Sequence, residues 1–309
     1  MLWVLLALAG AVADAGYYVT TKKMLQTINP HVLAAGSFLF TSFFLFVLAF
    51  YSGIPAIGSK FLVAVAMTTA LNVIATIFTY KALASTDISI TMPMISFTPV
   101  FLIGTSFLFL HELPTLIGII GILIIVFGSY ILNLSPGQKS IADPIRSMFV
   151  HRGVLYMLFV AFLYAIAINF DKITVQESDP FFGSAVVFFV LGSAFVIIAA
   201  ISRRTAGTLA TGKEETSESG EQKLRSPAGH FGSMVGVFIF IGLILTVGAI
   251  SINYAYSMQI VPYIISIKRM SIIFIVISGA IVFREPNIGQ RLCGAGLMVI
   301  GAVIILLSL

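Results

Sequence analysis

Residues 109–128 read FLHELPTLIGIIGILIIVFG, and residues 282–301 read VFREPNIGQRLCGAGLMVIG. The second stretch begins 173 positions after the first (282 − 109), and one glutamate and two glycines recur at matching positions. The matched pairs are Glu112 with Glu285, Gly121 with Gly294, and Gly128 with Gly301. Identical spacing around a charged residue predicts an internal repeat.

The composition around these stretches is that of a membrane protein. Of the 309 residues, 59% are hydrophobic and 9% are charged, and the mean hydropathy is +1.08. Because a soluble domain carries about 25% charged residues, this chain has too little polar surface to cover a globule in water. These values exclude a disordered chain, a secreted disulfide scaffold and a cytosolic enzyme.

The rest of the composition argues against most kinds of reactive site. Cys293 is the single cysteine, so the chain has no internal disulfide and no cysteine cluster for a metal. The net charge of +5 is scattered, which predicts no nucleic-acid partner. No phosphate loop, metal-ligand spacing or catalytic triad is present, so we expect no cofactor, no metal and no enzymatic activity.

Ten apolar segments are long enough to cross a bilayer, because a helix needs about 20 mostly apolar residues to span the hydrocarbon core. Backbone groups find no partners in lipid, so each segment must be helical. The sequence therefore predicts an all-α integral membrane protein with ten transmembrane helices. The segments are 2–19, 32–51, 61–84, 88–110, 115–134, 153–170, 181–201, 231–257, 261–283 and 288–309.

The repeat divides these segments into two sets of five. Further matches at an offset of 150 pair Lys22 with Lys172 and Pro30 with Pro180. Because five is odd, the second set must enter the membrane in the opposite orientation, which makes an inverted repeat whose substrate site lies between the halves. We assign the first repeat to residues 1–134, a connecting loop to 135–152 and the second repeat to 153–309, with a polar, flexible loop at 202–230.

Two adjacent cations interrupt the ninth segment. Lys268 and Arg269 lie about 11–12 Å into the helix at 1.5 Å per residue. One long basic side chain could reach the interface, but two neighbours on a helix point about 100° apart and cannot share one short route. We therefore predict that both line a cavity and bind an anion, with Ser266 beside them.

Asp14 is the other charge within a predicted span. It shares one helix face with Tyr18 and Thr21, at positions i, i+4 and i+7. A carboxyl group in a low dielectric can serve as a proton switch, but it can equally be the counter-ion of Lys268 or Arg269. Both roles stay open, and either way two cations against one carboxylate predict a surplus positive charge.

Weaker polar positions complete the predicted cavity, although such groups often only bond helix to helix. They lie on four of the predicted spans: Asn72 and Tyr80 on the third, Tyr18 on the first, Asn169 on the sixth and Asn253 on the eighth. Glu112 and Glu285 lie at span ends, and we expect them to hold the fold together rather than to act in chemistry.

These features resemble the drug/metabolite transporter superfamily, EamA type. The likeness lies in the five-plus-five arrangement, in Phe109–Glu112 and Val282–Glu285, and in the glycine-spaced helix that follows each motif. It implies a ten-helix transporter in a bacterial or archaeal plasma (inner) membrane. Members carry amino acids, nucleotide sugars, organophosphates and cationic drugs, so the resemblance implies no single substrate.

The resemblance also bears on individual residues. Lys268 and Arg269 look like the ninth-helix pair with which triose-phosphate translocators of this superfamily grip phosphate, but the fourth segment lacks their third basic group. The stretch that ends at Asp14 is similar to the first helix of small multidrug-resistance relatives, which carries a proton-coupling carboxylate. Pro99 falls opposite Ile272 at the offset of 173, so we expect any break in the fourth helix not to recur in the ninth.

The functional prediction is a secondary active transporter of a small anionic metabolite, an organophosphate or an amino or organic acid, working by alternating access. The alternatives are an exporter of amphipathic or cationic drugs coupled to protons through Asp14, and a lipid-linked flippase or partner subunit. The expected partners are a small, anionic substrate and membrane lipid, with the chain as a monomer or homodimer.

Overall fold

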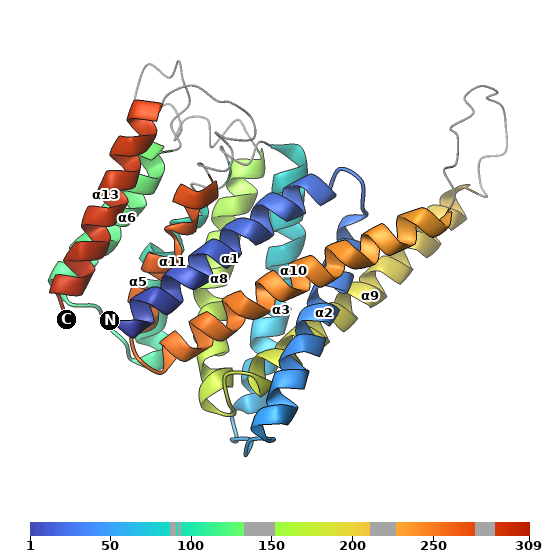
Figure 1. The fold of residues 1–309 in the computed structure, drawn as a ribbon, viewed down its shortest axis with the longest axis horizontal. Coiled ribbons are helices and arrows are strands. Elements are labelled where there is room, and N and C mark those ends of the chain that lie inside the picture. The colour runs from blue at the N-terminus through green and yellow to red at the C-terminus, as the bar shows by residue number, and fades with distance from the viewer. Residues whose placement is uncertain (87–90, 92–93, 133–151, 211–226, 276–287) are drawn as a thin grey trace.

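A computed structural model describes residues 1–86, 91, 94–132, 152–210, 227–275 and 288–309. The described residues form helices and connecting turns, with no strand among them, which confirms the all-α fold class. Both termini lie on the same side of the molecule (Figure 1). An even number of membrane crossings leads to that arrangement.

The helices fall into two sets. The first set consists of α1 (Leu2–Met24), α2 (Pro30–Ser52), α3 (Phe61–Ser85), α5 (Thr98–Leu110) and α6 (Leu116–Leu132). The second consists of α8 (Arg152–Gln176), α9 (Phe182–Ala210), α10 (Pro227–Tyr256), α11 (Val261–Lys268) and α13 (Ile288–Leu307). The predicted connecting loop, 135–152, lies outside the described residues except for Arg152, where α8 begins, and the predicted division stays a prediction.

Helix starts follow local capping chemistry. Asn29 accepts a hydrogen bond from the backbone N–H of His31, and Pro30 occupies the first turn of α2, where no intrahelical donor is needed. At the equivalent start of the second set, Asp179 accepts bonds from the N–H groups of Phe181 and Phe182. The matched prolines of the sequence repeat therefore mark two similarly capped helices.

Several helices extend beyond the apolar segments that predicted them, among them three of the second set. Helix α8 runs to Gln176 instead of ending at residue 170, α9 runs to Ala210, and α10 begins at Pro227. The predicted loop at 202–230 is therefore wrong at both ends, while residues 211–226 lie outside the described ranges. Hydropathy marks where a segment leaves lipid, whereas a helix continues into water as long as its residues favour helical structure.

The packing of the helices is symmetric between the two sets. Helix α1 packs against α10 as α3 packs against α8, and α1 meets α11 as α8 meets α5. Helix α2 packs against its equivalent α9, and α6 packs against its equivalent α13. Exchanging the two sets returns the same pairs, as a two-fold axis between repeats requires.

The glycines of the opening motif show that the repeat is inverted. Gly121 lies against Gly301 and Gly128 lies against Gly294, so α6 and α13 run antiparallel, side by side at one end of the molecule (Figure 1). A Cβ atom added at Gly128 would lie 2.8 Å from the carbonyl oxygen of Gly294. Because equivalent helices run in opposite directions, the prediction of two inverted repeats is confirmed.

The fourth helix of each set is interrupted at matching positions. The N–H of Phe97 bonds to the carbonyl of Met94 at 3.2 Å, and the N–H of Met270 bonds to that of Ile267 at 2.9 Å. Both are i→i−3 bonds, and the two donors lie 173 residues apart (270 − 97), so the expectation of an asymmetric break is wrong. Proline is therefore not required for the interruption, which recurs where Ile272 stands opposite Pro99.

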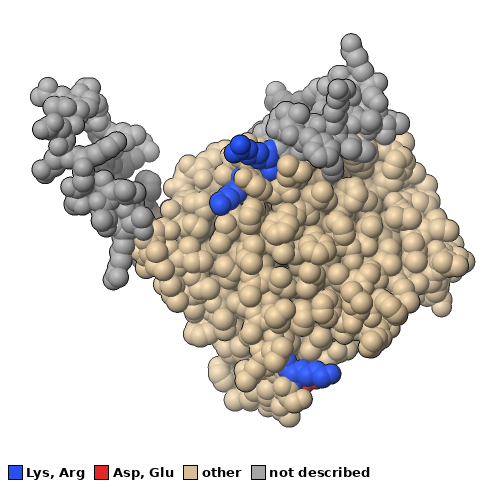
Figure 2. Space-filling model, turned by 180° about the vertical axis from the view of Figure 1, so that it is seen from behind, with Lys and Arg blue, Asp and Glu red and all other residues tan. Residues whose placement is uncertain are grey.

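The outer surface suits a bilayer. Six described helices are long and apolar enough to cross a membrane, namely α1, α2, α3, α8, Phe182–Ser202 of α9 and Met234–Tyr256 of α10. Large apolar side chains such as Phe50, Leu62 and Ile197 are exposed. Figure 2 shows a face whose charged side chains gather near two opposite ends, with a broad uncharged zone between them. The chain is an integral, multi-pass membrane protein.

Candidate transport site

A cavity of about 200 Å³ lies where α1, α3, α8, α9, α10 and α11 converge. Both repeats contribute to its wall, as inverted-repeat architectures require of a substrate site. Six residues singled out from the sequence line it: Asp14, Tyr18, Asn72, Asn253, Lys268 and Arg269. The apolar remainder of the wall comes from side chains such as Phe38 and Ile252.

Asp14 and the two cations form one cluster on this wall. The Nζ of Lys268 lies 2.9 Å from Oδ1 of Asp14, and Nη1 of Arg269 lies 3.6 Å from Oδ2. The Lys268 side chain is 22% exposed and that of Arg269 only 3%. Asp14 therefore neutralises one of the two charges, and the geometry is that of a counter-ion.

The interruption of the ninth segment positions Arg269. Helix α11 ends at Lys268, and Arg269 is its C-cap, so both cations lie at the negative end of the α11 dipole. The Nη2 of Arg269 donates to the hydroxyl of Thr98 at 3.1 Å, which links the break in one repeat to the break in the other. Its Nε is buried and has no partner among the described residues.

Three predicted site residues do not line the cavity. The hydroxyl of Tyr80 meets that of Tyr17 at 3.1 Å, and Ser266 donates to the carbonyl of Pro262. Asn169 accepts from Ser106 and donates to Thr105. Their polar groups make helix-to-helix or local hydrogen bonds, and contact of these three residues with substrate stays a prediction.

The cavity also contains a charged residue that the sequence analysis missed. Asp171 lies on its wall and accepts a hydrogen bond from the hydroxyl of Thr68, which in turn accepts one from Asn72. The predicted sixth span ends at residue 170, one residue before Asp171, so apolar length gives no reason to place Asp171 in the membrane. The match between Lys22 and Lys172 was a signal for Asp171. At the same offset of 150, Asp171 falls opposite Thr21, which shares a helix face with Asp14.

With Asp171 included, the cavity holds two cations and two carboxylates. The expected surplus positive charge is therefore wrong for the cavity as a whole. The distribution is nevertheless uneven, because Asp14 lies between Lys268 and Arg269, whereas Asp171 makes no ion pair within the described ranges.

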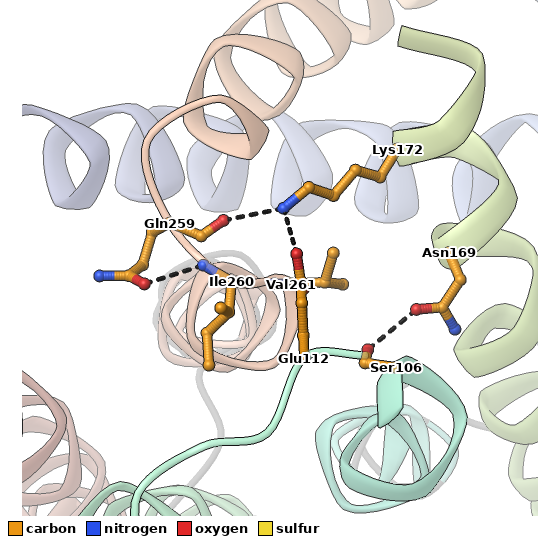
Figure 3. A network of polar contacts seen from close by, with 7 residues as sticks. All are labelled: Ser106, Glu112, Asn169, Lys172, Gln259, Ile260 and Val261. Atoms are coloured by element: carbon orange, nitrogen blue, oxygen red, sulfur yellow. Dashed lines mark hydrogen bonds and ion pairs between the residues drawn. The ribbon is translucent and has the colours of Figure 1, made fainter. Parts of the chain in front are cut away.

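Glu112 holds the repeats together outside the cavity (Figure 3). Its carboxylate lies 2.5 Å from the Nζ of Lys172 on α8 and accepts the N–H of Val261 at 2.8 Å, at the start of α11. Lys172 also donates to the carbonyl of Gln259, as Lys22 donates to the carbonyl of Thr86 at the matching position of the first repeat. The expectation that Glu112 has a structural role is supported, while Glu285 lies outside the described residues.

The arrangement offers no metal centre in the described part of the chain, where no three His, Cys, Asp or Glu side chains come together. Its chemistry is that of reversible binding by charges and hydroxyl groups, at the meeting point of two inverted halves.

Sequence comparison agrees with this architecture. The model of the EamA-like transporter family matches residues 1–134 and 151–307. The chain belongs to that family. This match confirms the resemblance inferred from the two motifs. The EamA-like family consists of membrane transporters of small molecules rather than enzymes.

Structural comparison supports the same fold. One solved crystal structure of a protein is similar over 99% of this chain and 98% of its own, with a TM-score of 0.70 and 12% sequence identity. At that identity the likeness concerns the fold alone. No curated protein matches the sequence.

Proposed function

We propose that this EamA-like transporter is a secondary active carrier of a small anionic metabolite. The observation that carries the proposal is the pair Lys268 and Arg269 on the cavity wall, with the Nε of Arg269 buried and without a partner among the described residues. A buried donor without an acceptor costs about 1–3 kcal/mol. A carboxylate or phosphate oxygen would relieve that cost, and a guanidinium beside an ammonium suits such oxygens.

The size of the cavity favours a metabolite over a drug. Pockets for drug-sized ligands enclose about 300–1,000 Å³. The present cavity is about 200 Å³ and is walled by Tyr18, Asn72 and Asn253 among apolar side chains. A molecule with a few carbon atoms and one or two polar groups suits this space better than a bulky amphipathic compound.

The charge balance favours a monoanion. The four charged groups of the cavity sum to zero, so a phosphate dianion would leave two uncompensated negative charges in a low dielectric. An organic or amino acid with one carboxylate would leave at most one uncompensated negative charge. Organophosphates stay within the proposed class, with carboxylates preferred.

The inverted repeats supply the means of transport. In such architectures one half rocks against the other around a central site, which opens the site to each side of the membrane in turn. The cavity is lined by both repeats, and Arg269 and Thr98 join their two interrupted helices. We assign to Asp14 the role of a counter-ion that keeps Lys268 and Arg269 aimed at the cavity.

An exporter of cationic drugs is the weaker candidate because Asp14, its expected cation site, already contacts two cations. Nothing in the described residues favours a lipid-linked flippase or a partner subunit. Transport of a small anion by the monomer or homodimer in a plasma membrane is therefore the proposal to test.

A thermal-shift screen tests this proposal, since a ligand that binds only the folded state raises the melting temperature. The purified protein is screened against acetate, L-alanine, inorganic phosphate, phosphorylated sugars and tetraphenylphosphonium. We expect small carboxylates to stabilise the wild type, and the shift to be lost in Arg269→Gln but kept in Lys23→Gln, whose lysine is exposed at the end of α1. Stabilisation by the cation alone, or a full shift in Arg269→Gln, would contradict it.

A further inference from the structure

Asp171 differs from Asp14 in what surrounds it. Its carboxylate lies on the cavity wall, half-buried, and accepts a hydrogen bond from Thr68. Asp14 lies within 4 Å of both cations, whereas no ion-pair partner of Asp171 occurs among the described residues. An intramembrane carboxylate without such a partner calls for a functional explanation.

The hydrogen bonds around Asp171 engage one of its two carboxylate oxygens. Asn72 donates to the Thr68 hydroxyl at 3.0 Å, so the Thr68 proton is directed at Oδ1 of Asp171. The Asn72 amide also donates to the Thr68 carbonyl, which fixes the chain of donors. Oδ2 has no such donor among the described groups and remains available.

The described helices packed against α8 present a small set of titratable and polar groups near Asp171. Helix α11 and its C-cap present Lys268 and Arg269, α10 presents Tyr256, and the described side chains of α9 that line the cavity include one polar group, the hydroxyl of Ser184. Helix α3 offers Thr68 and Asn72, and the described residues of α5 are not titratable. On α8 itself, Tyr164 lines the cavity and Lys172 is directed to Glu112; Asp14 faces the cavity from α1.

Charge balance then couples an anion to a proton. In the empty cavity, the charge of Asp171 balances the cation that Asp14 leaves uncompensated. Binding of an anion adds one negative charge inside the protein, where an uncompensated charge is unfavourable. A proton that moves from hydronium to Oδ2 of Asp171, leaving water and a neutral carboxylic acid, restores neutrality.

We propose that Asp171 is the proton-coupling carboxylate of the transporter, taking up one proton with each bound monoanion and releasing it when the anion leaves. This inference rests on the proposed function, because it needs an anion at Lys268 and Arg269. It makes the carrier a proton–anion symporter in which a monoanion crosses without net charge.

Infrared titration of the protein in liposomes tests the proposal, because a protonated carboxylic acid has a C=O band that the carboxylate lacks. We expect one such band to appear as the pH falls from 8 to 5, and to vanish in Asp171→Asn. The matched control is Glu177→Gln, a carboxylate just beyond α8 that accepts the N–H of Lys60. If no band appears, or if it persists in Asp171→Asn, the proposal is overturned.

Acetate supplies the second readout. We expect acetate to move the wild-type band to higher pH, because anion and proton stabilise each other's binding. Thr68→Val, which keeps the carboxylate but removes its hydrogen bond, should retain the band and move its midpoint. If acetate stabilises the protein but leaves the band in place, the coupling fails while the anion site stands.

The two failures can be told apart. If acetate does not raise the melting temperature of the wild type, the proposed function is contradicted, independently of the infrared result. A preference for L-alanine over acetate at every pH, lost in Asp171→Asn, would assign Asp171 to a substrate ammonium group and overturn the proton role.

Discussion

Asp14 shows how much one residue determines in this cavity. It is the described ion-pair partner of both Lys268 and Arg269. Asp14→Asn leaves the buried Arg269 without its counter-ion, and breaking a buried pair on one side costs about 3–5 kcal/mol. We expect a lower melting temperature in detergent, partly restored in the double variant Asp14→Asn with Lys268→Met. A double variant less stable than the single one would argue against the counter-ion role.

At this scale the sequence predicted the charged cluster but not the whole site. Lys268, Arg269 and Asp14 stand out because a charge within an apolar run needs a reason. Asp171 escaped notice because it follows the apolar run, although α8 continues to Gln176. The sequence does not distinguish cavity residues from Tyr80, Asn169 and Ser266. Only the structure shows that the polar groups of these three hydrogen-bond to other protein groups.

Among the elements, α6 and α13 depend on glycine for their close approach. A Cβ atom at Gly301 would lie 2.7 Å from the carbonyl oxygen of Gly121, whereas one at Gly296 on the same helix would meet nothing within 4 Å. Overpacking costs about 1–3 kcal/mol. Gly301→Ala should therefore lower the melting temperature and Gly296→Ala should not. Equal melting temperatures would show that the contact is looser than described.

The start of α11 depends on Glu112. Glu112→Gln keeps an oxygen for the N–H of Val261 but loses the ion pair with Lys172, whereas Glu112→Ala loses both. We expect the alanine variant to be the less stable of the two by about 1 kcal/mol, the usual value of a helix-start acceptor. Thermal unfolding of the two variants side by side measures the difference. If the glutamine variant were the less stable of the two, Glu112 would not cap α11.

The elements themselves were largely predictable, and their interruptions were not. Apolar length predicted the segments in which these helices lie, because a span must cover the hydrocarbon core, although α5 and α11 are too short to do so alone. The break at Arg269 and Met270 has no proline or glycine to signal it. At this break Arg269 makes a tertiary contact, a hydrogen bond to Thr98 of the other repeat, which sequence alone does not reveal.

At the scale of the whole molecule, two antiparallel copies of one five-helix unit enclose a polar cavity. The glycine and glutamate spacing predicted this arrangement, because equal spacing in both halves reflects equal helix packing. The cargo could not be predicted in the same way. The net charge of the cavity depends on Asp171, whose place in the wall is set by how α8 packs against α3.

Cysteine accessibility tests the central claim most directly, because it reports a water-filled, anion-attracting cavity without requiring a known substrate. In a Cys293→Ser background, Thr76→Cys places a thiol on the cavity wall, and Ile74→Cys places one on the exposed outer face of the same helix. We predict that Thr76→Cys reacts from either side of the membrane, and faster with an anionic than with a cationic thiosulfonate. Lys268→Gln with Arg269→Gln leaves two carboxylates in the cavity and should reverse that preference, and Ile74→Cys should not react. No reaction at position 76 from either side, or faster reaction with the cationic reagent, would contradict the account.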